Sequence, residues 1–153
     1  MALYLVQHGK SLPKEEDPEQ GLSVDGTAEV ERIADVARQY GVRVGGIQHS
    51  GRKRAQQTAE ILAAALHPEK GVQMRTGIDP LDEVTIVAND LHAAEGLMLV
   101  GHLPFMERLT SYLITGSSDK LVFKFQNGGI VCLDQEQDRH SWFIKWSLMP
   151  KIG

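Results

Sequence analysis

The chain has 153 residues, of which 42% are hydrophobic and 24% charged, and its formal net charge is −4 at pH 7. These values predict one globular domain over residues 1–153 and argue against disorder and against sequence-independent binding of nucleic acid. A single cysteine, Cys132, excludes an intramolecular disulfide framework and a cysteine-rich zinc site. Because the N-terminus does not resemble a signal peptide and no apolar run is long enough to span a membrane, we expect a cytoplasmic protein that binds neither membrane nor nucleic acid.

Up to about Gly116, short apolar runs alternate with segments of helical periodicity. We predict strands over residues 3–6, 44–48, 72–75 and 97–100. Short continuous apolar runs are typical of strands that are buried on both faces. Helices are predicted between and after them, over residues 30–40, 55–66, 84–91 and 104–113. Asp82 is a candidate N-cap of the third helix, and Pro104 is predicted to open the fourth.

Beyond Gly116, apolar and polar residues alternate strictly. This pattern predicts further strands over residues 121–125, 130–132 and 142–148, at a sheet edge and antiparallel. Trp142 and Trp146, four residues apart, are predicted to share one face of the last strand and to belong to the core. The whole pattern predicts a single-domain, three-layer α/β/α fold, with a mostly parallel sheet and antiparallel strands at its edge.

Chemically reactive side chains follow three of the predicted strands. His8, His49 and His102 each lie at or just beyond a strand end, and Arg54 follows His49 closely. Ligands of such sheets bind outside the carboxyl ends of the strands. Two kinds of site could use these groups: a metal site on the three histidines, or an anion site in which arginine and imidazolium groups surround a phosphate that a neutral imidazole attacks. The sequence contains neither an H-E-x-x-H metal motif nor the phosphate loop of nucleotide-hydrolysing proteins.

Three blocks of the sequence resemble those of the histidine phosphatase superfamily, which is also called phosphoglycerate-mutase-like. Leu5-Val6-Gln7-His8-Gly9 resembles the Arg-His-Gly signature, and Ser50 to Thr58 resembles the block Ser-x-x-x-Arg-Ala-x-Gln-Thr. Gly101-His102-Leu103-Pro104 resembles the third block. The compact length and the His-Leu-Pro triplet look most like the SixA-type phosphohistidine phosphatases. The blocks follow the family's order over nearly the whole chain, so the resemblance implies a phosphoglycerate-mutase-like fold.

The resemblance also implies a phosphatase that needs neither a metal nor another cofactor. His8 would be the nucleophile that forms a phosphohistidine intermediate, while Gln7, Arg54 and His102 would bind the phosphoryl oxygens. The general acid would come from the segment between the second and third blocks, where Asp82 and Glu83 are the candidates. The expected partner is a phosphorylated signalling protein, such as a histidine-phosphotransfer domain that carries phosphohistidine, or else a small phosphate ester.

Gln7 departs from the family, which has a phosphate-binding arginine at this position. Glutamine brings an amide but no charge and no guanidinium fork. Lys10 could restore the charge, or it could be an ordinary solvated lysine. Two alternatives therefore stay open. The chain could be a phosphate- or phosphoprotein-binding module with weak or no turnover, or it could be a small-molecule phosphomonoesterase.

Overall fold

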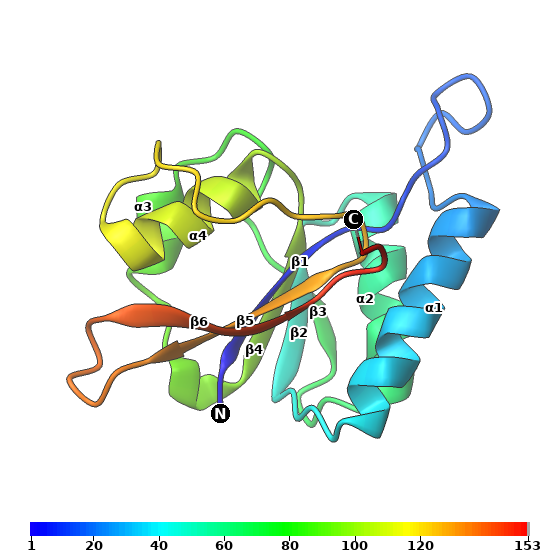
Figure 1. The fold of residues 1–153 in the computed structure, drawn as a ribbon. Helices are drawn as coiled ribbons and strands as arrows, with labels where there is room; N and C mark the ends of the chain where they lie inside the picture. Colours follow the sequence, from blue (N-terminus) through cyan, green and yellow to red (C-terminus); the bar gives the residue numbers. More distant parts are fainter. Residues whose placement is uncertain (153) are drawn as a thin grey trace.

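The centre of the molecule is a six-stranded sheet with the strand order β3-β2-β4-β1-β5-β6 (Figure 1). The computed structural model describes residues 1–152. The strands are β1 (Leu3–Gln7), β2 (Gly46–His49), β3 (Val72–Met74), β4 (Leu97–Gly101), β5 (Ile130–Gln135) and β6 (Trp142–Leu148). Strands β3, β2, β4 and β1 are parallel to one another, whereas β5 pairs antiparallel with β1, and β6 antiparallel with β5. The predicted mostly parallel sheet with antiparallel edge strands is confirmed.

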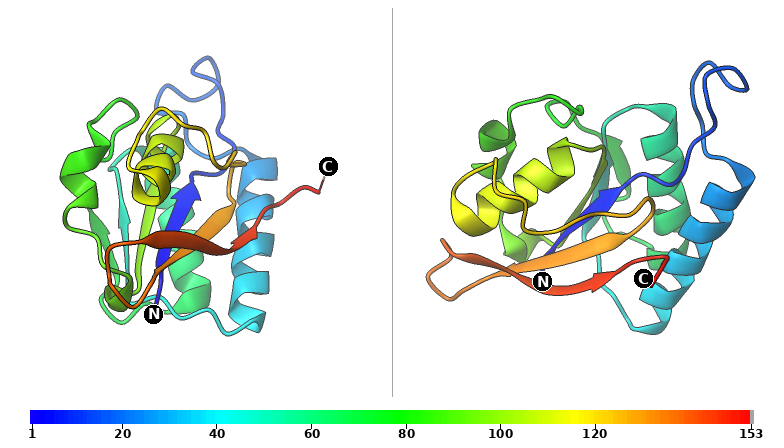
Figure 2. Two further views of the ribbon diagram at one scale, coloured as in Figure 1. Left: turned by 60° about the vertical axis from the view of Figure 1, so that its left-hand side comes forward. Right: turned by 45° about the horizontal axis from the view of Figure 1, so that its top comes forward.

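Helices cover both faces of this sheet (Figures 1 and 2). They are α1 (Val24–Gln39), α2 (Lys53–Leu66), α3 (Val84–Ala88) and α4 (Phe105–Thr115), with a short 3-10 helix, η1 (Ala93–Glu95). Helices α1 and α2 lie side by side against one face, and α3 and α4 lie against the other. Each face has its own apolar core, so the predicted α/β/α layering is confirmed.

Strand β1 shows why continuous apolar runs mark this sheet. Tyr4 and Val6 pack in the core beneath α1 and α2, while Leu3 and Leu5 pack in the core beneath α3 and α4. All four are nearly or completely buried. Because successive side chains of a strand point to opposite faces, a strand covered on both sides needs an apolar residue at every position.

The strand predicted over residues 121–125 is wrong, since this segment is irregular. It runs across the top of the molecule from α4 toward β5, as Figure 1 shows. Its backbone is held by a side chain instead of a neighbouring strand: the N–H of Phe125 donates to Glu107 Oε2 of α4 at 3.0 Å. The alternating residues cover α4 in part, with Phe125 buried and Leu121 exposed. Alternation along the sequence therefore reflects partial cover without strand pairing.

The prediction that Trp142 and Trp146 share one face is also wrong. The pairing of β6 with β5 shifts register between Cys132 and Leu133, which indicates a β-bulge. Trp146 lies opposite Cys132 and packs against the α1/α2 core, whereas Trp142 packs against the α3/α4 core. A bulge inserts one residue and so exchanges the faces beyond it.

The third helix also differs from its prediction. It is only five residues long, and its N-cap is Glu83, whose carboxylate accepts a hydrogen bond from the N–H of Thr85 at 3.3 Å. Asp82 instead accepts from the N–H of Asp79 at 2.8 Å. Two neighbouring carboxylates were available as caps, and the turn that precedes the helix uses the first of them.

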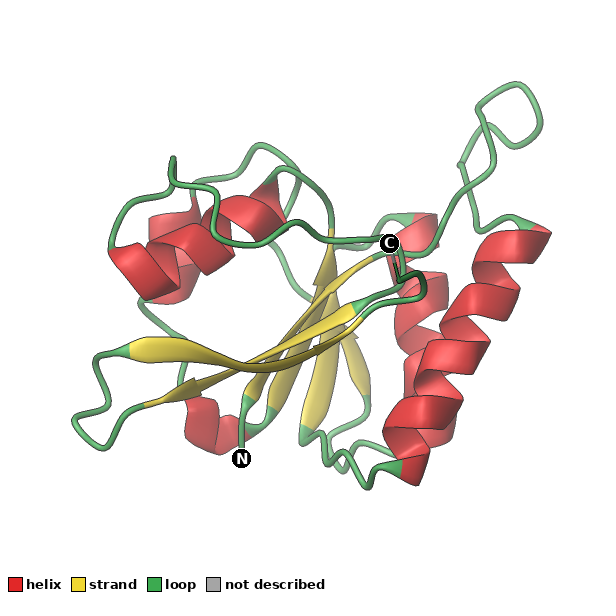
Figure 3. Ribbon diagram, in the orientation of Figure 1, coloured by secondary structure: helices red, strands yellow, loops and turns green. Residues whose placement is uncertain are grey.

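Long connections gather at the carboxyl edge of the parallel strands, which is the upper edge in Figure 3. The connection between β1 and α1 projects furthest, and it is closed at its base by an isolated β-bridge between Ser11 and Leu22. Strands β2, β3 and β4 end at the same edge, so the connections that follow them begin there. No helix among residues 1–152 has the length and apolar character that crossing a lipid bilayer requires.

Candidate active site

His8 and His102 meet at the carboxyl edge of the sheet. Gln7 of β1 pairs with Gly101 of β4, and the N–H of His8 donates to the Gly101 carbonyl at 2.9 Å. The two imidazole rings are 5.0 Å apart between centroids and inclined by 51°. Because β1 and β4 are parallel neighbours, the residues that follow them must leave the sheet together. The structure thus brings together the first and third blocks of the sequence.

Both ring nitrogens of His8 are engaged. Nδ1 lies 2.7 Å from the carbonyl oxygen of Gly9, and since that oxygen only accepts, Nδ1 carries the ring proton. Nε2 is left with its lone pair, which receives a hydrogen bond from Arg54 Nε at 3.3 Å. The pKa of His8 is lowered to about 4, mainly by burial and further by the Arg54 charge, against the opposing effect of the Gly9 carbonyl. His8 is therefore a neutral imidazole near pH 7, with its Nε2 directed to the guanidinium.

Helix α2 explains the second sequence block. Thr58 accepts a hydrogen bond from the N–H of Gly9 at 2.9 Å and donates one to the Arg54 carbonyl at 2.8 Å. Gln57 Oε1 accepts from the N–H of Leu22 at 2.7 Å. Residues three and four apart share one face of a helix, so Arg54, Gln57 and Thr58 all face the loop that begins at His8. The sequence identified this block but gave Thr58 no role.

His102 is buried, with only 2% of its surface exposed. Its Nε2 is 2.6 Å from Ser50 Oγ, and its Nδ1 has no hydrogen-bond partner. Burial lowers the pKa of His102 to about 3, with further lowering by His8, Arg54 and Arg52. His102 is thus neutral as well. Ser50 belongs to the second sequence block, and the structure links it directly to the third.

Gln7 and Lys10 lie on either side of His8 in the sequence but differ in environment. Gln7 is 9% exposed, and its Oε1 is buried without a partner. The side chain of Lys10 is exposed, while its carbonyl oxygen holds the start of α1 by accepting from the N–H of Ser23 at 3.0 Å. The contacts of Lys10 thus give its backbone a structural role.

The two predicted acids make only local hydrogen bonds, as a turn acceptor (Asp82) and as the cap of α3 (Glu83). They line a cleft of about 540 Å³ that also includes Pro104, two residues beyond His102. Asp79, in the same segment, is connected to His102 through Arg52 and Ser50. It forms an ion pair with Arg52 at 3.3 Å, and the N–H of Arg52 lies 3.4 Å from Ser50 Oγ. Nothing in the sequence distinguishes Asp79 from Asp82 and Glu83.

His49 is not part of the histidine pair. It is the last residue of β2, it is buried, and its Nδ1 accepts from the N–H of Gly51 at 3.0 Å. Residues 1–152 contain no group of three or more His, Cys, Asp or Glu side chains placed to hold a metal ion. The alternative of a three-histidine metal site is therefore not formed.

The loop before β5 supports the backbone of His8, which sequence reasoning missed. Asn127 Nδ2 donates to the His8 carbonyl at 3.0 Å. The N–H of Gly128 donates to the carbonyls of Gln7 and His8, at 2.9 and 3.2 Å. Gly128 has a φ of +79°, a conformation that favours glycine. An Asn-Gly-Gly sequence predicts a turn, but nothing in it indicates which backbone the turn will hold.

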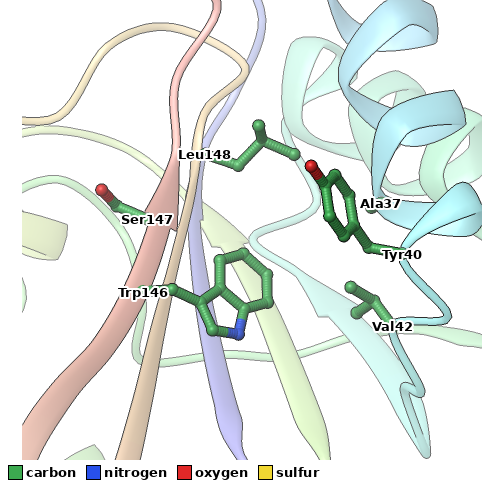
Figure 4. Close-up of a pocket in the computed structure, with 6 residues that line it drawn as sticks. All are labelled: Ala37, Tyr40, Val42, Trp146, Ser147 and Leu148. Carbon is green, nitrogen blue, oxygen red and sulfur yellow. The ribbon is translucent and has the colours of Figure 1, made fainter.

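A separate apolar recess of about 380 Å³ lies between the end of α1 and strand β6 (Figure 4). Figure 4 shows the Trp146 ring and the exposed Tyr40 ring on either side of it, with Val42 below. Its lining holds no histidine, arginine or carboxylate, so its side chains cannot supply the chemistry of the histidine pair.

Comparison with known proteins identifies the fold through solved structures and not through sequence. No protein-family model and no curated protein sequence matches this chain. Solved structures of phosphatases match over nearly its whole length, and SixA phosphohistidine phosphatases are among them. The chain thus has the fold of that group, and it resembles the SixA phosphohistidine phosphatases within it.

Three of these structures illustrate the likeness. The protein histidine phosphatase SixA in complex with tungstate has a TM-score of 0.84 at 21% identity, with 98% of this chain and 97% of that one covered. A protein from Agrobacterium tumefaciens assigned as a SixA phosphohistidine phosphatase has a TM-score of 0.76 at 27% identity, with 97% of each chain covered. A protein from Escherichia coli assigned as an α-ribazole-5′-phosphate phosphatase has a TM-score of 0.75 at 14% identity, covering 100% and 98%.

Proposed function

We propose that this protein is a phosphatase in which His8 is the nucleophile, and that its substrate is a phosphohistidine of a signalling protein. The observation that carries the proposal is the arrangement of His8, with Nδ1 bonded to the Gly9 carbonyl and a lone pair on Nε2 beside Arg54. A neutral imidazole whose tautomer is fixed in this way is ready to attack an electrophile through Nε2. The fold shared with SixA phosphohistidine phosphatases supports the substrate class.

The reaction has two steps. In the first, His8 Nε2 forms a bond to phosphorus as the bond from phosphorus to the leaving group breaks, and the leaving group takes the bonding pair and a proton. In the second, water attacks the phosphorus of the phosphohistidine intermediate and gives a proton to the group that protonated the leaving group. The P–N bond breaks, and phosphate leaves as His8 regains its lone pair. The Gly9 carbonyl, 2.7 Å from Nδ1, stabilises the positive ring of the intermediate.

Arg54 is the group that can stabilise the negative charge of the transferred phosphoryl group. In the free protein its Nε–H donates to the nucleophile, so a bound phosphoryl group must take over that contact before the attack. His102 lies beside His8, and a ring proton on its unpartnered Nδ1 makes it a second, neutral donor to the phosphoryl oxygens. Gln7 contributes the amide of its side chain at the same strand end.

Asp82 and Glu83 remain the proposed proton donors to the leaving group. Their present hydrogen bonds are local, so a donor role requires the segment before α3 to shift toward His102. An imidazole leaving group has a far lower pKa than an alkoxide and needs less protonation. A site with no carboxylate bonded to its nucleophile therefore suits phosphohistidine better than a phosphate ester.

Gln7 favours a second candidate function, a phosphate- or phosphoprotein-binding module. Without a guanidinium at this position, the transition state loses a charged, bidentate contact. A hydrogen bond to a charged group contributes about 1.5–3 kcal/mol, which corresponds to about one to two decades in rate. Binding of a phosphoryl group in its ground state should lose less free energy than binding of the transition state. The charge is similar in both, but the ground state depends less on the exact placement of the donors.

The test compares substrates and variants. The protein is incubated with a phosphorylated histidine-phosphotransfer domain and, separately, with an aryl phosphate, and phosphate release is followed in single turnovers. We expect faster release from the phosphohistidine, a trapped phosphoryl group on His8, and loss of release in His8→Ala, whereas His140→Ala on the exposed β5–β6 turn keeps the wild-type rate. Binding without release supports the binding module instead. Release that persists in His8→Ala contradicts the nucleophile.

A further inference from the structure

Two buried polar atoms at the strand edge have no partner in the protein. Among the residues that the structure describes, Gln7 Oε1 and His102 Nδ1 are the buried side-chain nitrogen and oxygen atoms that make no hydrogen bond. Gln7 is 9% exposed and His102 2%. Folded proteins leave few such atoms, and a catalytic role or a bound water or ion is among the explanations for those they leave. Both atoms belong to residues next to the His8–Gly101 contact, so we expect a ligand to supply the missing partners.

The chemistry of Gln7 Oε1 restricts that ligand. In the orientation that the Gln7 amide has in this structure, its buried atom is the oxygen, which only accepts hydrogen bonds, so a ligand that contacts this atom must bring a donor. A fully deprotonated oxyanion such as sulfate has no donor, whereas a phosphoryl group with one protonated oxygen has one. His102 Nδ1 imposes no such restriction. Depending on whether Ser50 donates to Nε2 or accepts from it, Nδ1 is a donor or an acceptor toward the same ligand.

The charge of the site agrees with a monoanion. Arg54 is the cation in contact with His8, and the two histidines are neutral near pH 7. Arg52, the next cation along the chain toward Ser50, is paired with Asp79 at 3.3 Å. One uncompensated positive charge balances one negative charge better than two. An arginine in place of Gln7 would add a charge and remove the acceptor.

We propose that this site selects a phosphoryl group in its monoanionic form, and that Gln7 Oε1 accepts the hydrogen bond of the P–OH group. The proposal rests on the anion site of the proposed function and adds the protonation state of its ligand. By this proposal, the change from the family's arginine to Gln7 does more than remove a positive charge. Gln7 also determines which anion the site prefers.

The test is a comparison of phosphate with sulfate by isothermal titration calorimetry, at one pH below the second pKa of phosphate and one above it. Sulfate keeps its charge at both, so titration of the protein affects both anions, and only phosphate changes its own protonation. We expect wild type to bind phosphate at least about tenfold more tightly than sulfate at the lower pH, because a hydrogen bond of this kind corresponds to about a factor of ten. The preference should shrink at the higher pH.

Two variants identify the residue. Gln7→Met keeps the length of the side chain without its polar atoms, and Gln7→Arg replaces the acceptor by donors. Both should lose the preference, and in Gln7→Arg sulfate should bind more tightly than in wild type. Gln39→Met, at the exposed end of α1, is the matched control and should keep it.

Equal binding of the two anions by wild type at both pH values overturns the proposal without any variant. A preference that survives in Gln7→Met, or no binding of either anion, also overturns it. The titrations need no turnover, so a protein that fails the phosphatase assay can still show the preference. Conversely, an active phosphatase that does not distinguish the anions refutes only this inference.

Discussion

The two histidines of the site differ in how the fold uses their ring nitrogens. His8 has a backbone carbonyl on Nδ1 and a guanidinium on Nε2, so its tautomer is fixed. His102 has a serine hydroxyl on Nε2, which can donate or accept, and nothing on Nδ1. A hydroxyl lets the ring change its tautomer when an anion binds, whereas a carbonyl does not. These partners suit a nucleophile and a switchable donor, respectively.

At the same scale, Gln7→Arg should raise the single-turnover rate of phosphate release by about one to two decades. The reason is the regained charged, bidentate contact with the transferred phosphoryl group. The unpartnered Gln7 Oε1 marks a polar position where a guanidinium can find a ligand. Rapid-quench measurements of phosphate release check this, with Gln39→Arg as the control for added charge. A variant no faster than wild type would show that Gln7 costs the reaction nothing.

At the scale of elements, the start of α1 and the loop that follows His8 depend on one close approach. An added Cβ on Gly26 would lie 2.1 Å from the Lys10 carbonyl oxygen, and that oxygen already accepts from Ser23 at the helix N-cap. The added Cβ would meet backbone atoms of Lys10, so no flexible side chain could move aside to make room for it. Helix α1 therefore packs on the residues that follow His8, and a change at its first turn reaches the site.

We accordingly expect Gly26→Ala to lower the free energy of unfolding by about 1–3 kcal/mol, the usual cost of overpacking, despite the better helix propensity of alanine. Phosphate binding should weaken as well, because the loop that starts at Gly9 must shift. Gly46→Ala is the matched control, since its Cβ would meet only the Lys70 side chain, at 3.3 Å. Urea denaturation measures the free energy of unfolding, and isothermal titration calorimetry measures phosphate binding. Equal stability of the two variants would contradict the close approach.

For the whole molecule, the two neutral histidines link stability to pH. In the folded protein the pKa of His8 is lowered from 6.5 to about 4, and that of His102 to about 3. Between those values and 6.5 the unfolded chain binds protons that the folded chain excludes. Their contribution to stability is therefore complete above about pH 6.5, and it is lost as the pH falls from there toward the folded pKa values.

Urea denaturation at about pH 7 and about pH 5 measures this dependence, and we expect a lower unfolding free energy at the acidic value. His102→Asn, which removes one of the two titrating groups, should show a smaller loss between the two conditions than wild type. His140→Asn, on an exposed turn, should show the same loss as wild type. If His102→Asn and wild type lose equally, groups other than His102 cause the acid sensitivity.

The sequence by itself determined the layers, the parallel core of the sheet and the pair His8 and His102. Continuous apolar runs report burial on both faces, and the carboxyl ends of parallel strands must meet at one edge. Arg54 was predicted from its position shortly after the second strand and from the block that resembles the family's. These features depend on local pattern and on general rules of topology.

Only the tertiary structure decided the rest. The bulge that sends Trp142 and Trp146 to opposite faces, the irregular path of residues 121–125, and the loop contact of Asn127 with His8 arise from partners distant in sequence. The unpartnered atoms of Gln7 and His102, and the different partners of Asp79, Asp82 and Glu83, likewise depend on where each side chain lies in space. Alternation and residue type record how much of a side chain is covered, and they do not record what covers it.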